Sequence, residues 1–286
     1  TQQRQTQQEI MKLNRVYAVI SQINEMVVRT REESIILKEA CRIAVEFGNF
    51  KLAWIGEVDY EAERVIPTLW AGEENGYLNE LGHISILDEP LGQGPVGTSV
   101  RTGKHCLVND MTQDPSLEPW RESALKHGFR STVALPIIVQ NKVAKVFSMA
   151  SSELDFFNDS ELKLLEEVTN DIAYALETLE LEKTRDKSLK ALKESEHRFR
   201  ALFEHLINGV SVYTPTEDGK DFYIRDINPA GERITNGRRE EIVGKVAGEV
   251  FPGLIEKGLM EVFKEVYRTG TPQQSFSFNY VNGKDC

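Results

Sequence analysis

Apolar residues recur at intervals of three and four along the N-terminal part of the chain. The stripe runs through Ile10, Leu13, Tyr17 and Ile20, a spacing that is typical of an amphipathic helix. Such a stripe either packs on the helix's own domain or forms the seam of a parallel dimer, and the spacing allows both. We expect a dimerisation helix over residues 1–28.

The middle of the chain carries the pattern of β-strands joined by turns. β-branched and aromatic residues are dense in the stretches 51–59, 65–71, 105–109, 132–139 and 142–148. The first two and the last two stretches predict hairpins, the second of which turns at Gln140-Asn141. A helix is expected before them over 32–47, and a short one over 119–127. Glycines crowd the stretch 72–104, which predicts loops and short helices.

A helical period returns at Ser160 and lasts for about forty residues. The apolar positions Leu165, Val168, Ile172 and Leu179 predict a second stripe, which we expect to pair with the first in the dimer seam. Charged residues follow the stripe, with Glu182 and Asp186 on the expected seam positions, and apolar spacing resumes out of phase at Leu189. Such a break predicts a helix that is loosened between about 180 and 188.

The C-terminal part predicts a second, smaller domain. The stretches 209–214 and 222–227 predict a hairpin, short helices are expected over 229–236, 238–243 and 255–268, and a strand begins at 276. That strand leads into Asn282-Gly283, a strong turn signal, and the sequence ends three residues later. We therefore expect a sheet that lacks its next strand.

Composition places the chain among ordinary globular proteins. Its 286 residues are 40% hydrophobic and 28% charged, which fits about two domains of roughly 150 residues. The net charge of −11 argues against nucleic acid and against a polybasic membrane contact. The longest apolar run, 133–139, is too short to cross a bilayer, and the first ten residues hold no apolar signal core, so we expect a cytoplasmic protein. The scattered Cys41, Cys106 and Cys286 predict neither a disulfide framework nor a metal site.

Residues 29–178 resemble a GAF domain, a small-molecule-sensing module of signalling proteins. The resemblance lies in GPVGTSVRTGKHCLVND (94–110), DPSLEPW (114–120), HGFRSTVALPIIVQNKV (127–143) and Phe156-Phe157. One departure is Lys145, where the family usually has glycine. The resemblance implies an antiparallel sheet flanked by helices.

Residues 198–286 resemble part of a PAS domain, through SEHRFRALFEHLINGV (195–210), DINPAGERITNG (226–237) and EEIVGK (240–245). The predicted fold class is therefore α+β, a GAF domain joined by a long coiled-coil-like helix to a partial PAS domain. We take 179–197 as the helical linker. The order GAF, helix, PAS resembles the sensory part of a sensor histidine kinase of a two-component system, or that of a diguanylate cyclase.

No catalytic constellation is present in the sequence. It holds no P-loop, GxSxG, HExxH or kinase glycine loop, and His197 lacks the acidic residue and the proline of a phosphoacceptor box. A cyclic-nucleotide signature is matched only in part, by Asn141-Lys142, Phe156, Asp159 and Glu161, and these residues equally suit a turn, a core and a helix start.

The resemblances also exclude three familiar cofactors. A covalent bilin requires a cysteine in the helix at 120–128, and a LOV flavin adduct requires one within 226–255, but neither stretch contains cysteine. A PAS haem of the oxygen-sensor type requires a histidine within 226–272, which has none. The cofactor, if there is one, stays unknown.

The binding sites are expected in the two domains' pockets. The resemblance implies a GAF ligand between the sheet and the segment 75–125. The GAF pocket candidates are Trp54, Trp70, Cys106, Asp110, Trp120, Arg130 and Ser131, and the PAS candidates are Phe203, Asn228 and Phe251. We expect the chain to be a homodimeric sensory fragment that binds an unidentified small molecule and signals to a C-terminal transmitter absent from this chain. The alternatives are the input region of a diguanylate cyclase or phosphodiesterase, a cyclic-nucleotide-binding regulator, and a ligand-free dimerisation scaffold.

Overall fold

The structure is a computed structural model that describes residues 2–274, without the side chains of residues 2–9, 11 and 12. The chain divides into two compact units, residues 1–185 and 186–286, each described below by itself. The strand expected from 276 and the turn at Asn282-Gly283 lie outside the described residues.

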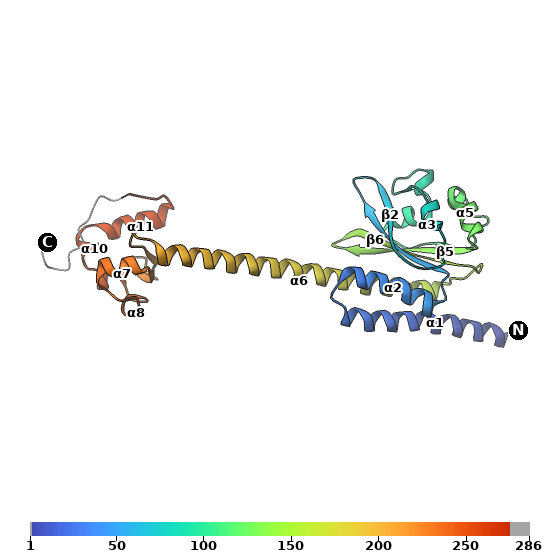
Figure 1. The fold of residues 1–286 in the computed structure, drawn as a ribbon, viewed down its shortest axis with the longest axis horizontal. Coiled ribbons are helices and arrows are strands. Elements are labelled where there is room, and N and C mark those ends of the chain that lie inside the picture. The colour runs from blue at the N-terminus through green and yellow to red at the C-terminus, as the bar shows by residue number, and fades with distance from the viewer. Residues whose placement is uncertain (1, 275–286) are drawn as a thin grey trace. The chain divides into compact units, whose positions relative to one another are not determined.

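The first unit is built on a six-stranded antiparallel sheet in the order β3-β2-β1-β6-β5-β4 (Figure 1). Its strands are β1 (Leu52–Asp59), β2 (Arg64–Gly72), β3 (Ile84–Ser85), β4 (Cys106–Val108), β5 (Ser131–Val139) and β6 (Lys142–Ser151). The two predicted hairpins, β1–β2 and β5–β6, are confirmed. Gln140 and Asn141 both take positive φ in the second hairpin's turn, a conformation that asparagine tolerates better than most residues.

Side chains alternate between the two faces of this sheet. Trp54 of β1 lies opposite Ser148 of β6 in the ladder, and both belong to one face. Ala53, Ile55 and Phe147 belong to the other face, where they join a separate apolar core. The sheet is therefore buried on both sides, and each face has its own cover.

One face is covered by three helices (Figure 1). They are α1 (Gln2–Arg29), α2 (Glu33–Gly48) and the first part of α6 (Asp159–His205). The stripe Leu165, Val168, Ile172 and Leu179 belongs to this core, and Ile172 is 0% exposed. Placing these four residues in a dimer seam was wrong, because they already pack against their own sheet. Of the α1 seam candidates, Ile10 and Tyr17 are exposed, whereas Leu13 and Ile20 are partly buried.

Short elements cover the opposite face. They are α3 (Tyr77–Glu80), the 3-10 turn η1 (Pro90–Gly92), α4 (Pro95–Thr102), the 3-10 turn η2 (Pro115–Trp120) and α5 (Arg121–Lys126). Gly97 in α4 is required by close approach, since a Cβ there would lie 2.4 Å from the Gly92 carbonyl oxygen and 2.5 Å from that of Ser85. The glycine-rich segment is thus a tightly folded cover over the sheet.

A capping box starts α6. The Asn158 side chain accepts a hydrogen bond from the Glu161 N–H at 2.9 Å, and the Glu161 carboxylate accepts one from the Asn158 N–H at 3.1 Å. Glu161 also pairs with Arg15 of α1 at 2.6 Å. These bonds fix the helix start beside α1.

The helix α6 is continuous from Asp159 to His205. It has no break between 180 and 188, so the change of apolar phase does not interrupt the helix. Whether this stretch opens more readily than residues 165–179 stays a prediction for amide exchange. None of the described helices combines the length and the apolar character that crossing a bilayer requires.

As far as residue 274, the second unit contains a two-stranded antiparallel sheet and five short helices after the end of α6. The elements are β7 (Ser211–Pro215), β8 (Phe222–Ile227), α7 (Pro229–Thr235), α8 (Arg239–Ile242), α9 (Ala247–Val250), α10 (Gly253–Glu256) and α11 (Leu259–Thr269). The predicted hairpin is confirmed. Its small core is formed around Phe222, Ile224 and Ile227.

Candidate functional site

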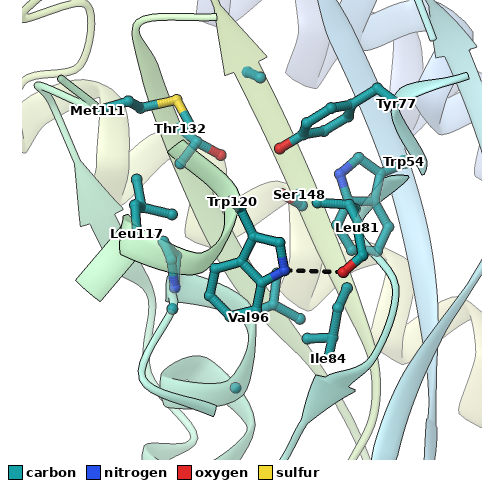
Figure 2. Close-up of a pocket in the computed structure, with 14 residues that line it drawn as sticks. Trp54, Tyr77, Leu81, Ile84, Val96, Met111, Leu117, Trp120, Thr132 and Ser148 are labelled. Carbon is teal, nitrogen blue, oxygen red and sulfur yellow. Dashed lines mark hydrogen bonds between the residues drawn. The ribbon is translucent and has the colours of Figure 1, made fainter. Parts of the chain in front are cut away.

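A small cavity lies between the sheet and its short covering elements (Figure 2). It measures about 40 Å³ as the space open to the centre of a water molecule, several times the roughly 10–15 Å³ that one water needs. Its lining is Trp54, Tyr77, Leu81, Ile84, Gly94, Pro95, Val96, Gly97, Met111, Leu117, Trp120, Thr132, Ser148 and Ala150. The site is therefore a narrow, aromatic-rich chamber on the face opposite the long helices.

Three neighbouring strands form the floor of this cavity. Trp54 comes from β1, Ser148 from the central strand β6, and Thr132 from β5. Each is at least nine-tenths buried. The Thr132 hydroxyl donates to the Met149 carbonyl oxygen at 3.0 Å, so its proton is already used within the sheet.

The cover is held closed by Trp120. Its Nε1–H donates to the Leu81 carbonyl oxygen at 2.9 Å and links η2 to the segment after α3 (Figure 2). A Cβ at Gly94 would lie 2.5 Å from the Trp120 ring, so glycine lets the start of α4 approach the indole. Trp120 is thus both wall and latch.

A polar cluster outside the cavity makes a second link between α3 and α5. The Glu80 carboxylate accepts hydrogen bonds from Ser123 Oγ at 2.6 Å and from Lys126 Nζ at 2.8 Å. The hydrogen bond from Lys126, and then that from Ser123, lowers the pKa of Glu80. These contacts are exposed and individually weak, but they add a connection from α3 to α5 beside the Trp120 bond, which joins η2 to the segment after α3.

The seven predicted GAF-pocket residues divide into two groups. Trp54 and Trp120 line the cavity, whereas Trp70, Cys106, Asp110, Arg130 and Ser131 are not in its lining. Trp70 lies opposite Trp54 in the ladder, so it shares the face, but it is 49% exposed because the cover does not reach it.

The other four residues have local roles around the cavity. Asp110 accepts a hydrogen bond from the Thr112 N–H at 2.8 Å and one from the Thr112 hydroxyl, and the hydroxyl contact lowers the Asp110 pKa most. Ser131 donates to the Glu153 carbonyl oxygen at 2.9 Å. The Arg130 guanidinium reaches the Phe129 carbonyl oxygen at 3.4 Å. Cys106 is half-buried, and burial raises its thiol pKa.

Sequence reasoning missed Tyr77, Met111 and Ser148. Ser148 was detectable, because strand alternation places it on the same face as Trp54 once β1 and β6 are paired. Tyr77 and Met111 come from the aperiodic cover, where no spacing predicts which side chain points inward. Burial raises the pKa of Tyr77 well above its ordinary value, so its hydroxyl stays protonated.

The partial cyclic-nucleotide signature does not converge on the cavity. Phe156 and Glu161 lie on the helix-covered side, where the Arg15 guanidinium carbon is 3.6 Å from the Phe156 ring centroid. Asn141 belongs to the β5–β6 turn, and Lys142 Nζ lies 3.7 Å from the Tyr60 ring centroid. These residues support the structure of the domain.

Neither described cysteine lines the cavity. Cys41 lies in α2, where burial raises its pKa to about 12. His105 Nδ1 lies 2.6 Å from Glu166 Oε1 of α6. The pKa of its neighbour Cys106 is raised by burial and by the charge of Asp114, and the charge of Arg101 lowers it in part. Among the described residues, no three histidine, cysteine or carboxylate side chains are grouped as metal ligands.

The three PAS candidates are buried in the second unit. Asn228 caps α7: its Oδ1 accepts from the N–H groups of Val210 and Gly231, both at 2.8 Å, and its Nδ2 donates to the Asn208 carbonyl oxygen at 2.9 Å. These bonds occupy the amide, so it supports the backbone. Phe203 stacks on Phe199 at 5.6 Å, and Phe251 belongs to the small core.

A six-stranded antiparallel sheet with long helices on one face and a covered cavity on the other defines a domain that encloses a small site against its sheet. Residues 30–177, more than half of the chain, match the GAF domain family, and the chain belongs to that family.

The chain is also similar to individual proteins. It is 27% identical over 176 residues to the methyl sulfide methyltransferase-associated sensor of Methanosarcina acetivorans, a match that covers 61% of this chain and 16% of that protein. Free methionine-R-sulfoxide reductase of Neisseria meningitidis aligns with a TM-score of 0.50 at 17% identity, over 58% of this chain and 90% of that one. This likeness shows the fold alone. A GAF domain region from Geobacter sulfurreducens aligns with a TM-score of 0.43 at 24% identity, over 54% and 99% of the two chains.

Proposed function

We propose that this chain is the sensory part of a signalling protein whose GAF domain binds a small molecule in the cavity beside Trp54 and Trp120. The observation that carries the proposal is the cavity itself, which lies between a sheet floor and a cover held by the Trp120 hydrogen bond. A relative that is named a sensor supports this reading. The transmitter that we favour is a two-component histidine kinase, with a diguanylate cyclase or phosphodiesterase as the alternative.

The central strand offers a route from the cavity to the helices. On β6, Ser148 lines the cavity while its neighbours Phe147 and Met149 belong to the core that holds Ile172 of α6. A ligand that moves the cavity side of β6 therefore also changes the surface against which α6 packs. Binding would then shift the population between two helix packings.

The proposed homodimer uses a different face of α6 from the one first expected. Tyr174, Leu181, Leu192, Phe199 and Leu202 are each between 58% and 72% exposed. They share one series of alternating four- and three-residue steps, completed by the polar positions 178, 185, 188 and 195. A seam of this spacing fits a parallel coiled coil between two copies, with polar seam positions that reduce its stability.

Two alternatives of other classes have less support. A cyclic nucleotide carries a phosphate, but the described lining of the cavity holds no lysine, arginine or histidine. A sulfoxide reductase requires a two-electron donor such as a thiol, and neither Cys41 nor Cys106 lines the cavity. A ligand-free scaffold is the remaining rival, and a binding experiment separates it from a sensor.

The test uses the whole chain purified under native conditions. Native mass spectrometry is expected to detect a small molecule that leaves on denaturation, or a thermal-shift screen of charged and uncharged metabolites is expected to find one that raises Tm. Replacing Trp120 by Ala should abolish the response, while replacing Trp70 by Ala should leave it. A chain that carries nothing and responds to no compound of either charge class would contradict the sensory role.

A further inference from the structure

Three polar side chains of the cavity lining have no hydrogen-bond partner among the described residues. The hydroxyls of Tyr77 and Ser148 and the indole N–H of Trp54 all belong to lining residues, and each residue is at least nine-tenths buried. The described part of the chain provides no hydrogen bond to any of the three groups. In Figure 2 the Tyr77 hydroxyl is directed toward the space between Thr132 and Trp54. These groups are therefore free to pair with a molecule that enters the cavity.

The start of α4 adds backbone donors to the same space. Gly94, Pro95, Val96 and Gly97 all line the cavity, and α4 begins at Pro95 without a side-chain cap. The first N–H groups of a helix have no partner within the helix, and its N-terminus carries partial positive charge. The indole N–H of Trp54 only donates, whereas the hydroxyls of Tyr77 and Ser148 donate as well as accept, so an acceptor on the ligand can satisfy all three groups.

Charge decides between two kinds of acceptor. The described lining contains no charged side chain of either sign. Enclosing a carboxylate or phosphate there removes its hydration without a cation to replace it, and the partial charge of one helix N-terminus compensates only a small part of that loss. An anion is thus disfavoured, and a carbonyl or ring acceptor satisfies the donors without that cost.

We infer that the cavity takes a small, uncharged ring compound that presents a hydrogen-bond acceptor to Tyr77, Ser148 and Trp54. The inference rests on the proposed sensory function and narrows the ligand class of the same site. Trp54 and Trp120 supply flat apolar walls for a ring. The volume of about 40 Å³ is smaller than the roughly 150 Å³ of a cavity that encloses benzene, so a ring enters only when the cover moves outward.

The test compares three probes of similar shape on the whole chain by titration calorimetry and thermal shift. Acetophenone carries a ring and a neutral acceptor, benzoate carries a ring and a negative charge, and toluene carries a ring alone. We expect acetophenone to bind at least tenfold more tightly than benzoate. Tyr77→Phe and Ser148→Ala should each weaken acetophenone about threefold to tenfold, as the loss of one hydrogen bond predicts, and should leave toluene unchanged. Tyr267→Phe, which changes an exposed tyrosine of α11 in the second unit, is the matched control.

Two results would overturn the inference. One is benzoate binding at least as tightly as acetophenone, and the other is acetophenone binding that does not respond to Tyr77→Phe or Ser148→Ala. If no probe binds, the ligand class is also wrong, and a charged compound that raises Tm in the same assay would leave the sensory proposal standing. Only the absence of binding by every compound would remove both.

Discussion

Single residues explain how α1 is joined to the helix that ends the GAF domain. Glu161 is fully buried and meets Arg15 at 2.6 Å, and the Arg15 side chain lies over the Phe156 ring. The pair connects α1 to the start of α6 in the middle of an apolar core. A buried pair of this kind contributes little net stability compared with apolar residues. Removing one partner, however, leaves the other as a buried charge without a counter-ion, which destabilises the fold.

The first prediction concerns this pair. Arg15→Met leaves the Glu161 carboxylate buried without its cation, so the free energy of unfolding should fall by about 3–5 kcal/mol. Adding Glu161→Gln removes the charge and keeps an acceptor for the capping bond, so the double variant should recover part of the loss. Urea denaturation measures both. Equal losses in the single and double variants would show that Arg15 acts through packing alone.

Lys145 makes a second, pH-dependent connection. Burial lowers the pKa of Lys145, but hydrogen bonds from its Nζ to Glu57 at 2.9 Å and to Glu33 outweigh burial, and the pKa is raised above its ordinary 10.5. The folded state therefore holds this proton more tightly than the unfolded state. Its contribution is complete below about pH 10.5 and is lost as the pH rises through the higher folded pKa. Lys145 thus joins β6 to α2 and β1.

Lys145→Met should consequently lower the free energy of unfolding by about 1 kcal/mol near pH 8. The difference from the unmodified protein should shrink above about pH 10.5. Thermal unfolding measured at both pH values provides the test. Lys104→Met, which changes an exposed lysine, is the control and should show no such pH-dependent difference. A difference that stays constant with pH would mean that the charge of Lys145 is not the cause.

At the scale of elements, α6 presents two apolar stripes with different roles. One stripe, which includes Leu165 and Ile172, is buried against the GAF sheet. The other, which includes Leu181 and Leu192, is exposed and keeps a single heptad phase. Because the two stripes lie on different faces, the apparent phase change in the sequence is a change from one to the other.

The exposed stripe predicts where dimerisation fails. Leu181→Glu combined with Leu192→Glu places like charges opposite each other in the proposed seam and should convert a dimer to a monomer. Leu189→Glu changes an equally apolar, 50% exposed residue at a flanking position where charge is normal in coiled coils, so it should leave the dimer intact. Light scattering after size-exclusion chromatography reports the mass. A monomeric unmodified chain, or equal effects of both changes, would refute the seam.

Periodicity predicted the elements far better than their partners. The GAF hairpins and the helix from about 160 follow from local pattern, because strand alternation and helical spacing are properties of neighbouring residues. Apolar residues spaced three and four apart on α6 have the same pattern whether they pack on their own sheet or on a second chain. The stripe that includes Leu165 was misassigned for that reason. The cavity was half predicted: Trp54 and Trp120 are prominent aromatics, whereas Tyr77 lies in an aperiodic cover that only the fold positions.

At the scale of the whole molecule, the chain holds separate apolar cores. Ile55 and Ile224 are both 0% exposed, but Ile55 belongs to a core within residues 1–185 and Ile224 to the small core of the second unit. Each unit buries its own hydrophobic surface, which is the main source of folding stability. We therefore expect the two units to unfold in separate transitions.

The distribution of tryptophan makes this expectation measurable. All three tryptophans, at positions 54, 70 and 120, lie in the first unit, so their fluorescence reports that unit alone, while circular dichroism reports helices in both. Ile55→Ala should destabilise the first unit by about 2–5 kcal/mol and shift the fluorescence midpoint. Ile224→Ala should destabilise the second unit by a similar amount. It should leave the fluorescence midpoint unchanged and shift only the second transition, which circular dichroism detects and fluorescence does not. If Ile224→Ala moves the fluorescence midpoint as far as Ile55→Ala does, the two units fold as one cooperative body. A signal from the GAF cavity would then be transmitted through that single body, and not along a helix that joins two independent units.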